Sequence, residues 1–244
     1  AQYQAPSATN ADMRRMTYDD VIIRTAGMFA VILATGALSW SLVTSSDEAT
    51  FSLGAMAVFA GAIGAFVLGL VNSFKREPSP ALILAYAAFE GLLLGGFSGV
   101  MEARYEGIVV QAVLATLATF GAMLAAYSFG GFRVQGRFRR VVVVATFGYM
   151  IFSLINFALM MTGMTTGAWG LRSLTIMGIP LGVPLGILAV ILASFFLAID
   201  FESIENGVRN GLPRRYAWAG AFGLVVTIVW LYVEFLRLLS YFRD

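Results

Sequence analysis

The chain has 244 residues, of which 59% are hydrophobic and 12% are charged, and its net charge at pH 7 is +2. A soluble domain carries about 25% charged residues, so this chain lacks the polar side chains to cover its surface in water, and a water-soluble fold is excluded. It has no Cys and no His, which excludes disulfides, thiolate chemistry and the commonest metal ligand. Any proton chemistry must therefore use carboxylates.

Seven apolar stretches are each long enough to cross a bilayer as a helix, which needs about 20 residues. In chain order they are residues 25–43, 51–74, 81–101, 107–129, 141–161, 181–199 and 216–239. The sequence therefore predicts an all-α integral membrane protein. Its seven-helix bundle forms a single transmembrane domain over residues 16–244, behind a disordered cytoplasmic tail over residues 1–15. The tail is polar and lacks the apolar core of a signal peptide.

Two shorter segments are expected next to these spans. Residues 16–24 are predicted to form an amphipathic lead-in, where Thr17 can cap a helix and Asp19 and Asp20 stand favourably in the first turn. The long connection over residues 162–178 is expected to contain a short interfacial element around residues 169–174. Two prolines, Pro180 and Pro184, place the start of the sixth helix nearby.

The basic residues predict the orientation in the membrane. Twelve of the 16 Lys and Arg residues fall on one side of the predicted spans and four on the other. Cytoplasmic loops carry the excess of positive charge, so the N-terminus is predicted to lie in the cytoplasm and, after seven crossings, the C-terminus outside. Because these residues form short clusters between apolar runs, they indicate orientation and no nucleic-acid-binding surface.

Glycines recur every four residues in two places. They are Gly91, Gly95 and Gly99 on the third span, and Gly178, Gly182 and Gly186 where the sixth begins. Small residues at this spacing let helices pack closely in lipid. Packing within the bundle is the favoured interpretation, and a symmetric dimer face is the alternative.

Three acidic residues stand inside or at the end of apolar spans, where a charge is costly and usually faces the protein interior or water. Glu90 lies near the middle of the third span, Asp200 at the end of the sixth and Glu234 toward the end of the seventh. They form either a titratable path for protons or cations, or buried hydrogen-bonded groups and ion pairs. The position of Glu90 favours a function. For Glu234, Arg237 one turn away favours an ion pair that reaches the membrane surface, and for Asp200 the two interpretations are equally supported.

Uncharged polar residues extend the same idea. Asn72, Asn156 and Thr227 lie in apolar runs and could line the same interior. Thr227, Trp230 and Glu234 share one face of a helix, because they are spaced by three and four residues.

Five segments of the sequence also resemble a known family. They are Asp200–Ile204, Tyr216–Trp218, Leu231–Leu239, Pro80–Tyr86 and Phe89–Leu92. Together they are similar to the Bax-inhibitor (TMBIM, YccA-like) superfamily, and in particular to its actinobacterial branch, over nearly the whole chain. The resemblance implies a bundle with a central last helix in a bacterial cytoplasmic (inner) membrane, and a pH-dependent calcium leak.

The resemblance also implies roles for single residues. In that superfamily two aspartates, one each on the sixth and seventh spans, share a proton as the pH sensor, and Asp200 matches the first of them. The second position corresponds to Thr227, and this chain has Glu234 instead, roughly 10 Å further along the helix axis. A basic residue near the end of the second span can latch onto the sixth-span aspartate, and Lys75 or Arg76 could serve here.

We therefore expect a calcium leak or other ion-conducting protein that is gated by protonation of carboxylates. Glu90 could supply the missing carboxylate from another helix, and Glu90 and Asp200 could bind calcium, which prefers oxygen ligands. No cofactor is expected, and calcium or protons enter only as permeant ions.

The alternative is a non-conducting regulator of an ATP-dependent membrane protease, a partner that some bacterial relatives bind. An intramembrane aspartyl protease would need two facing aspartates, and the chain offers one on a span. No glycine-rich phosphate loop occurs either. The sequence therefore predicts no enzyme.

Overall fold

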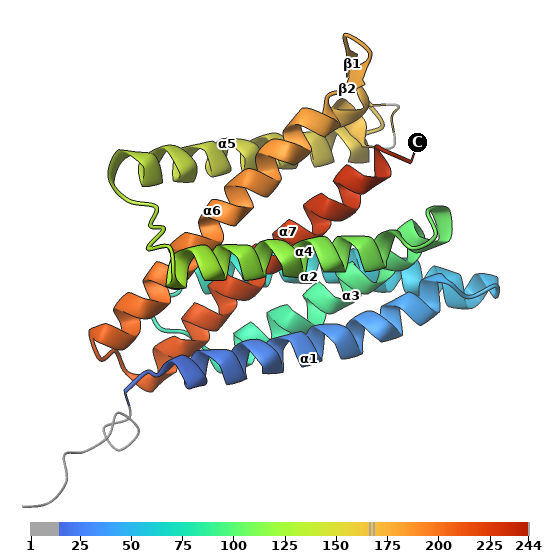
Figure 1. Ribbon diagram of the computed structural model, residues 1–244. Coiled ribbons are helices and arrows are strands. Elements are labelled where there is room, and N and C mark those ends of the chain that lie inside the picture. Colours follow the sequence, from blue (N-terminus) through green and yellow to red (C-terminus); the bar gives the residue numbers. More distant parts are fainter. Residues whose placement is uncertain (1–14, 166, 168, 244) are drawn as a thin grey trace, which may run out of the picture. The chain divides into compact units, whose positions relative to one another are not determined.

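The computed structural model describes residues 15–165, 167 and 169–243. Figure 1 shows the seven α-helices of these residues: α1 (Tyr18–Val43), α2 (Glu48–Phe74), α3 (Pro80–Arg104), α4 (Ile108–Ser128), α5 (Gly136–Met161), α6 (Gly182–Arg209) and α7 (Ala217–Ser240). Each of the seven is long and apolar enough to cross a membrane. The predicted all-α, seven-span membrane fold is therefore confirmed.

Short elements lie in two of the connections. The connection from α5 to α6 contains a 3₁₀ turn, η2 (Gly170–Ser173), and a hairpin of β1 (Thr175–Ile176) and β2 (Ile179–Pro180); a second turn, η3 (Arg214–Tyr216), precedes α7. η2 falls where the sequence predicted a short element, at residues 169–174. The hairpin was not predicted, because strands of two residues leave too little alternation to detect.

α1 and α6 extend furthest beyond the predicted spans. α1 begins at Tyr18 with Thr17 as its N-cap, whose hydroxyl accepts a hydrogen bond of 3.2 Å from the Asp20 amide. The predicted lead-in over residues 16–24 is thus the beginning of α1 and no separate helix. α6 continues past its predicted end at residue 199 to Arg209, since hydropathy marks only the apolar part of a helix. Asp200 consequently lies inside α6.

The described chain divides into two compact units. The first consists of Ala1–Arg104 and Asp200–Val226, and the second of Tyr105–Ile199 and Thr227–Asp244. α6 and α7 therefore contribute one part to each unit. The single transmembrane domain over residues 16–244 stays a prediction. Of the predicted tail, residues 1–14 lie outside the described residues.

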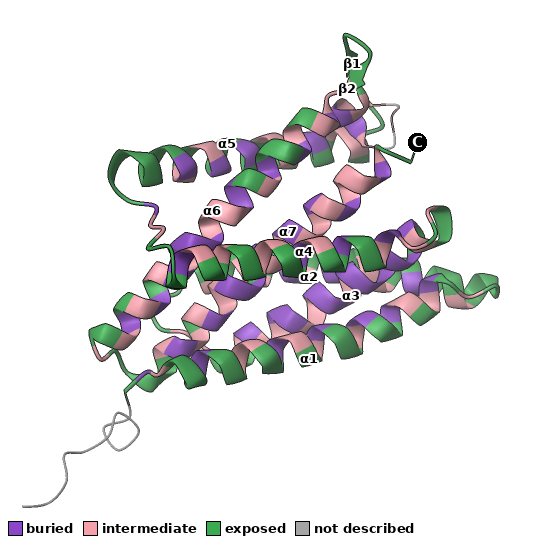
Figure 2. Cartoon of the chain, viewed as in Figure 1, coloured by how far each residue is buried: buried purple, intermediate pink, exposed green. Residues whose placement is uncertain are grey.

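The helices expose large apolar side chains, and Figure 2 shows exposed residues recurring along α1, α4 and α5. Leu33 on α1 is 70% exposed and Phe147 on α5 is 60% exposed. Leaving such side chains in water is unfavourable. The lipid bilayer is therefore the partner of these faces.

In the first unit, α1, α2 and α3 pack through glycines. A Cβ atom on Gly95 would collide with the backbone of Gly36 on α1, and a Cβ on Gly61 of α2 would lie 2.7 Å from the amide nitrogen of Leu93 on α3. Backbone atoms cannot move aside as a flexible side chain can. The packing predicted for the third-span glycines is thus found between helices of one chain.

The second glycine series has two different roles. Gly182 lies against the ring of Tyr241, and a Cβ on Gly186 would lie 3.2 Å from Leu238, so these two residues bring α6 and α7 together in the second unit. Gly178 has open space around it and a φ of +84°. It is therefore a turn residue of the hairpin and no part of a packing stripe, which corrects the prediction at this position.

Replacing Gly95 by Ala should destabilise the first unit by about 1–3 kcal/mol, because the added methyl group pushes the α1 and α3 backbones apart. Gly27→Ala on α1 is the matched control, since a Cβ added there would have no atom within 4 Å and Ala favours a helix over Gly by about 1 kcal/mol. Thermal unfolding in detergent measures both. Equal unfolding temperatures for the two variants would contradict the packing argument.

Candidate functional site

The three span-associated carboxylates divide between the two units. Glu90 and Asp200 belong to the first unit, and Glu234 belongs to the second. Each of the three has a different set of side chains around it.

Glu90 is enclosed by protein on α3. Its side chain is 8% exposed, and Tyr86, one turn earlier on the same helix, forms a hydrogen bond with it. The ring of Tyr86 meets that of Phe222 on α7 edge to face, with 5.0 Å between ring centroids. Glu90 is therefore turned toward the interior of the first unit, which is the environment that a titratable path requires.

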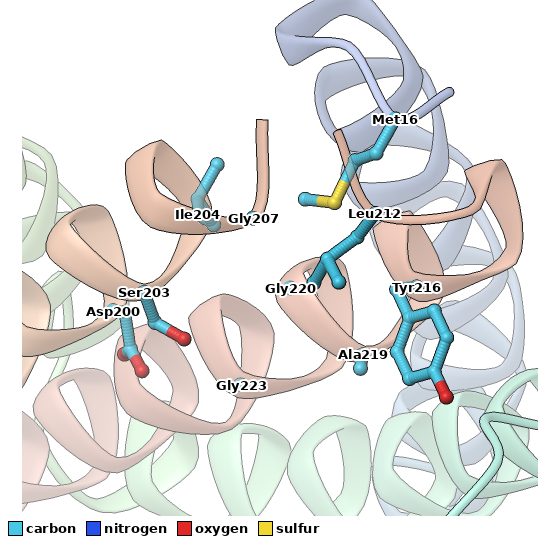
Figure 3. Close-up of a pocket in the computed structure, with 10 residues that line it drawn as sticks. All are labelled: Met16, Asp200, Ser203, Ile204, Gly207, Leu212, Tyr216, Ala219, Gly220 and Gly223. Atoms are coloured by element: carbon cyan, nitrogen blue, oxygen red, sulfur yellow. The ribbon is translucent and has the colours of Figure 1, made fainter. Parts of the chain in front are cut away.

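Asp200 lies on the wall of a pocket of about 170 Å³ in the first unit. Figure 3 shows Asp200 and Ser203 next to each other on α6, with Gly223 of α7 close by. A Cβ atom on Gly223 would lie 3.2 Å from Oδ1 of Asp200, so the missing side chain makes room for the carboxylate. The remaining lining residues are Met16, Ile204, Gly207, Leu212, Tyr216, Ala219 and Gly220.

The surroundings of the two acids are linked through α7. Phe222 contacts Tyr86, the hydrogen-bond partner of Glu90. Gly223, the next residue along α7, adjoins Asp200. The structure thus brings both acids into one unit, on helices that contact the same turn of α7. That they act together, or share a proton, stays a prediction.

The N-terminal segment covers one side of this pocket. The Met16 amide donates a hydrogen bond of 2.8 Å to the Leu212 carbonyl, and Arg15 forms an antiparallel bridge with Pro213. Met16 is 2% exposed and lines the pocket. The beginning of the described chain and the α6–α7 connection therefore both contribute to the wall of the pocket.

Ion pairs join the first turn of α1 to η3, the turn that precedes α7. Arg214 Nε donates to Asp20 Oδ1 at 2.7 Å, and Arg24 Nη1 donates to the same oxygen at 2.9 Å. Asp20 was expected to interact with the dipole of its helix. Its pairing with Arg214 was missed, because the two residues are 194 positions apart in the sequence and nothing in the sequence brings them together.

The candidate latch residues lie at the surface. Lys75 is the C-cap of α2, to which its backbone amide is hydrogen-bonded. Both Lys75 and Arg76 are exposed. Neither takes part in an ion pair in the part of the chain that the structure describes. In the same connection, Glu77 instead pairs with Arg215 at 2.9 Å. The latch stays a prediction.

Glu234 is the centre of a buried charge cluster in the second unit. It is 2% exposed, accepts a hydrogen bond from the Tyr149 hydroxyl, and pairs with Arg237 at 2.8 Å. Arg172, from η2, lies 3.6 Å from its other oxygen and is also 2% exposed. The predicted pair with Arg237 is thus present. Glu234 is buried in this pair, with Arg172 and Tyr149 beside it. That the pair reaches the membrane surface stays a prediction.

Arg172 is the functional-site residue that the sequence failed to single out. It donates hydrogen bonds to the Tyr149 hydroxyl at 2.7 Å and to the Ser153 hydroxyl at 2.8 Å. In the sequence it counted only as one of few basic residues on its side of the membrane. The sequence did offer one indication that Arg172 is unusual, because no other charged residue occurs between Arg140 and Asp200.

The polar residues expected to line a path have other or additional roles. Asn156 accepts a hydrogen bond of 2.7 Å from the Leu171 amide and donates to the Trp169 carbonyl at 3.2 Å, so it fastens the loop that carries Arg172. Asn72 donates to the Leu82 carbonyl at 3.2 Å and joins α2 to α3. Thr227 is buried on α7 in the second unit, on the same helix as Glu234.

No group of three acidic side chains that could hold a metal ion comes together in residues 15–165, 167 and 169–243. Calcium binding by Glu90 and Asp200 therefore has no preformed multidentate carboxylate cage in the described structure. A permeant ion needs weaker, successive contacts.

Glu234→Gln should lower the stability of the protein by about 3–5 kcal/mol, because it leaves the buried guanidinium groups of Arg172 and Arg237 without a counter-charge. Glu77→Gln is the matched control. It makes the same change in an exposed pair, where about 0–1 kcal/mol is expected. Unfolding temperatures in detergent compare the two variants, and a Glu234→Gln protein as stable as Glu77→Gln would contradict the cluster's structural role.

Comparison with known proteins adds the family. The comparison with curated proteins gives no match. A family model described as "Bax inhibitor 1 like" matches residues 1–244, the whole chain. This match confirms the resemblance seen in the third, sixth and seventh spans and agrees with the seven membrane-spanning helices. The chain belongs to the Bax inhibitor 1-like family of membrane proteins.

Proposed function

We propose that the protein is a pH-sensitive calcium leak, an ion-conducting membrane protein gated by protonation of Glu90 and Asp200. The observation that carries the proposal is the placement of both acids in one unit, beside residues that adjoin α7. Glu90 is buried next to Tyr86, whose ring contacts Phe222 of α7, and Asp200 lines a pocket and adjoins Gly223 of α7. We further propose that the membrane is the bacterial cytoplasmic membrane, with the N-terminus of the chain in the cytoplasm and the C-terminus outside.

The chemistry follows from the charge of the two acids. Ionised carboxylates attract calcium, which prefers oxygen ligands, and protonation removes that attraction. A change of charge at Asp200 also acts on α7, because the carboxylate fills the space left by Gly223. Protonation thus alters both the affinity for a cation and the contact between two helices, which are the two properties that a gate must couple.

The family resemblance supports Asp200 and requires a substitute for its partner. Asp200 stands where the superfamily has the first aspartate of its sensor, and Thr227 stands where it has the second. Thr227 cannot ionise near neutral pH. Glu90, a carboxylate buried within a span of the first unit, is the proposed replacement, and the charge-compensated Glu234 is assigned a structural role.

A calcium-flux assay in liposomes across pH tests the proposal with purified protein. We expect flux through the wild type that changes with pH, and loss of most of that change in Glu90→Gln and in Asp200→Asn, because neither amide can be deprotonated. Glu77→Gln, an exposed acid in the same unit, should retain the wild-type profile.

Two outcomes would oppose the proposal. A wild-type pH profile in both Glu90→Gln and Asp200→Asn would remove these acids from the gate. Absence of flux at every pH would favour the alternative, a non-conducting regulator of a membrane protease.

A further inference from the structure

The hairpin of β1 and β2 has no role in the proposed function. Its strands pair antiparallel, with Thr175 opposite Pro180 and Ile176 opposite Ile179. The Leu181 amide extends the pairing with a hydrogen bond of 2.8 Å to the Leu174 carbonyl. Figure 1 shows the hairpin extending past the first turn of α6.

The hairpin exposes several apolar side chains that lie close together in the sequence. Met177 at its tip is 98% exposed, and Leu174, Ile176 and Ile179 are each more than half exposed. Figure 2 shows the hairpin in the colour of exposed residues. No charged residue lies between Arg172 and Asp200 in the sequence. An exposed apolar patch of this kind marks a surface that binds another apolar partner.

The turn at the tip places an apolar side chain in a strained backbone conformation. Met177 has a φ of +54° and Gly178 a φ of +84°, the pattern of a two-residue turn that Asn-Gly adopts most readily. Among the described residues, Met177 is the only one other than glycine with a positive φ. Met therefore occupies a position where Asn would be less strained, while its nearly full exposure leaves no packing that would offset the strain.

We propose that the hairpin inserts its tip into the bilayer, in the interfacial region of the leaflet beside the first turn of α6. β2 ends at Pro180 and α6 begins at Gly182, so the hairpin is continuous with a membrane-spanning helix. Farther along α6, Ile187 and Leu188 are also exposed apolar residues.

The length of α6 places the hairpin at the membrane boundary. Its charge-free part, residues 182–199, rises about 27 Å, slightly less than the roughly 30 Å of the hydrocarbon core. The residues just before α6 therefore lie next to lipid. The paired strands satisfy part of their backbone hydrogen bonding internally, which entry into an apolar layer requires.

Insertion would fix the α5–α6 connection at both ends. Arg172 and Asn156 hold its first part to α5 and α7, and the hairpin holds its last part to lipid. The loop that completes the buried cluster around Glu234 would then be sensitive to the membrane as well as to the helices.

A fluorescent label at the tip tests the proposal. Since the chain has no Cys, Met177→Cys provides a single attachment site for the dye NBD, and Ser46→Cys in the exposed, polar α1–α2 connection provides the control site. In phosphatidylcholine liposomes we expect blue-shifted emission at position 177, quenching by nitroxide lipids, and at least fivefold weaker quenching by iodide than at position 46. Equal iodide quenching at the two positions would overturn the proposal.

A second variant separates insertion from folding of the hairpin. With NBD on Ile176→Cys, the additional change Met177→Asn suits the turn but removes the apolar tip, so we expect iodide quenching to rise severalfold without a fall in unfolding temperature in detergent. Unchanged quenching would count against insertion. Shielding that appears only at high protein density, together with disulfide cross-linking between copies of the Met177→Cys variant, would identify a second copy of this chain as the partner and would also overturn the proposal.

Discussion

A bilayer offers no water to an ionised or hydrogen-bonding group, so this chain must provide a partner for each polar atom that it carries into its spans. The three acids meet this requirement differently. Glu234 is surrounded by two guanidinium groups and a tyrosine hydroxyl. Glu90 receives a hydrogen bond from the neutral side chain of Tyr86, and Asp200 lies against a pocket and a glycine. Glu234, with its two cationic partners, is the acid for which we propose a structural role.

Much of the fold could be predicted because hydropathy alone decides which segments enter lipid. The ends of α2 and α5 coincide with the predicted ends at residues 74 and 161. The prediction was wrong where a helix outlasts its apolar part, as α6 does beyond residue 199, and where Gly178 was assigned to a packing stripe. There the glycine supplies a positive φ, which the spacing of glycines along a sequence does not reveal.

The candidate site was less accessible to sequence reasoning, because it depends on contacts between distant residues. The acids Glu90 and Asp200 were recognisable from their positions in apolar runs. The link through Tyr86 and Phe222 was not, since neither aromatic residue is unusual in a membrane span. Arg172 was missed because its loop lies outside the predicted spans, where a charged residue is ordinary. Only the structure shows that its guanidinium group is buried against Glu234.

The attachment of the N-terminal segment also matters for handling this protein. Arg15 and Met16 are joined to Pro213 and Leu212, and Met16 forms part of the wall beside Asp200. A truncation that removes Arg15 and Met16 would therefore remove part of that wall. Shortened versions of the chain intended for measurements on the pocket should keep these two residues.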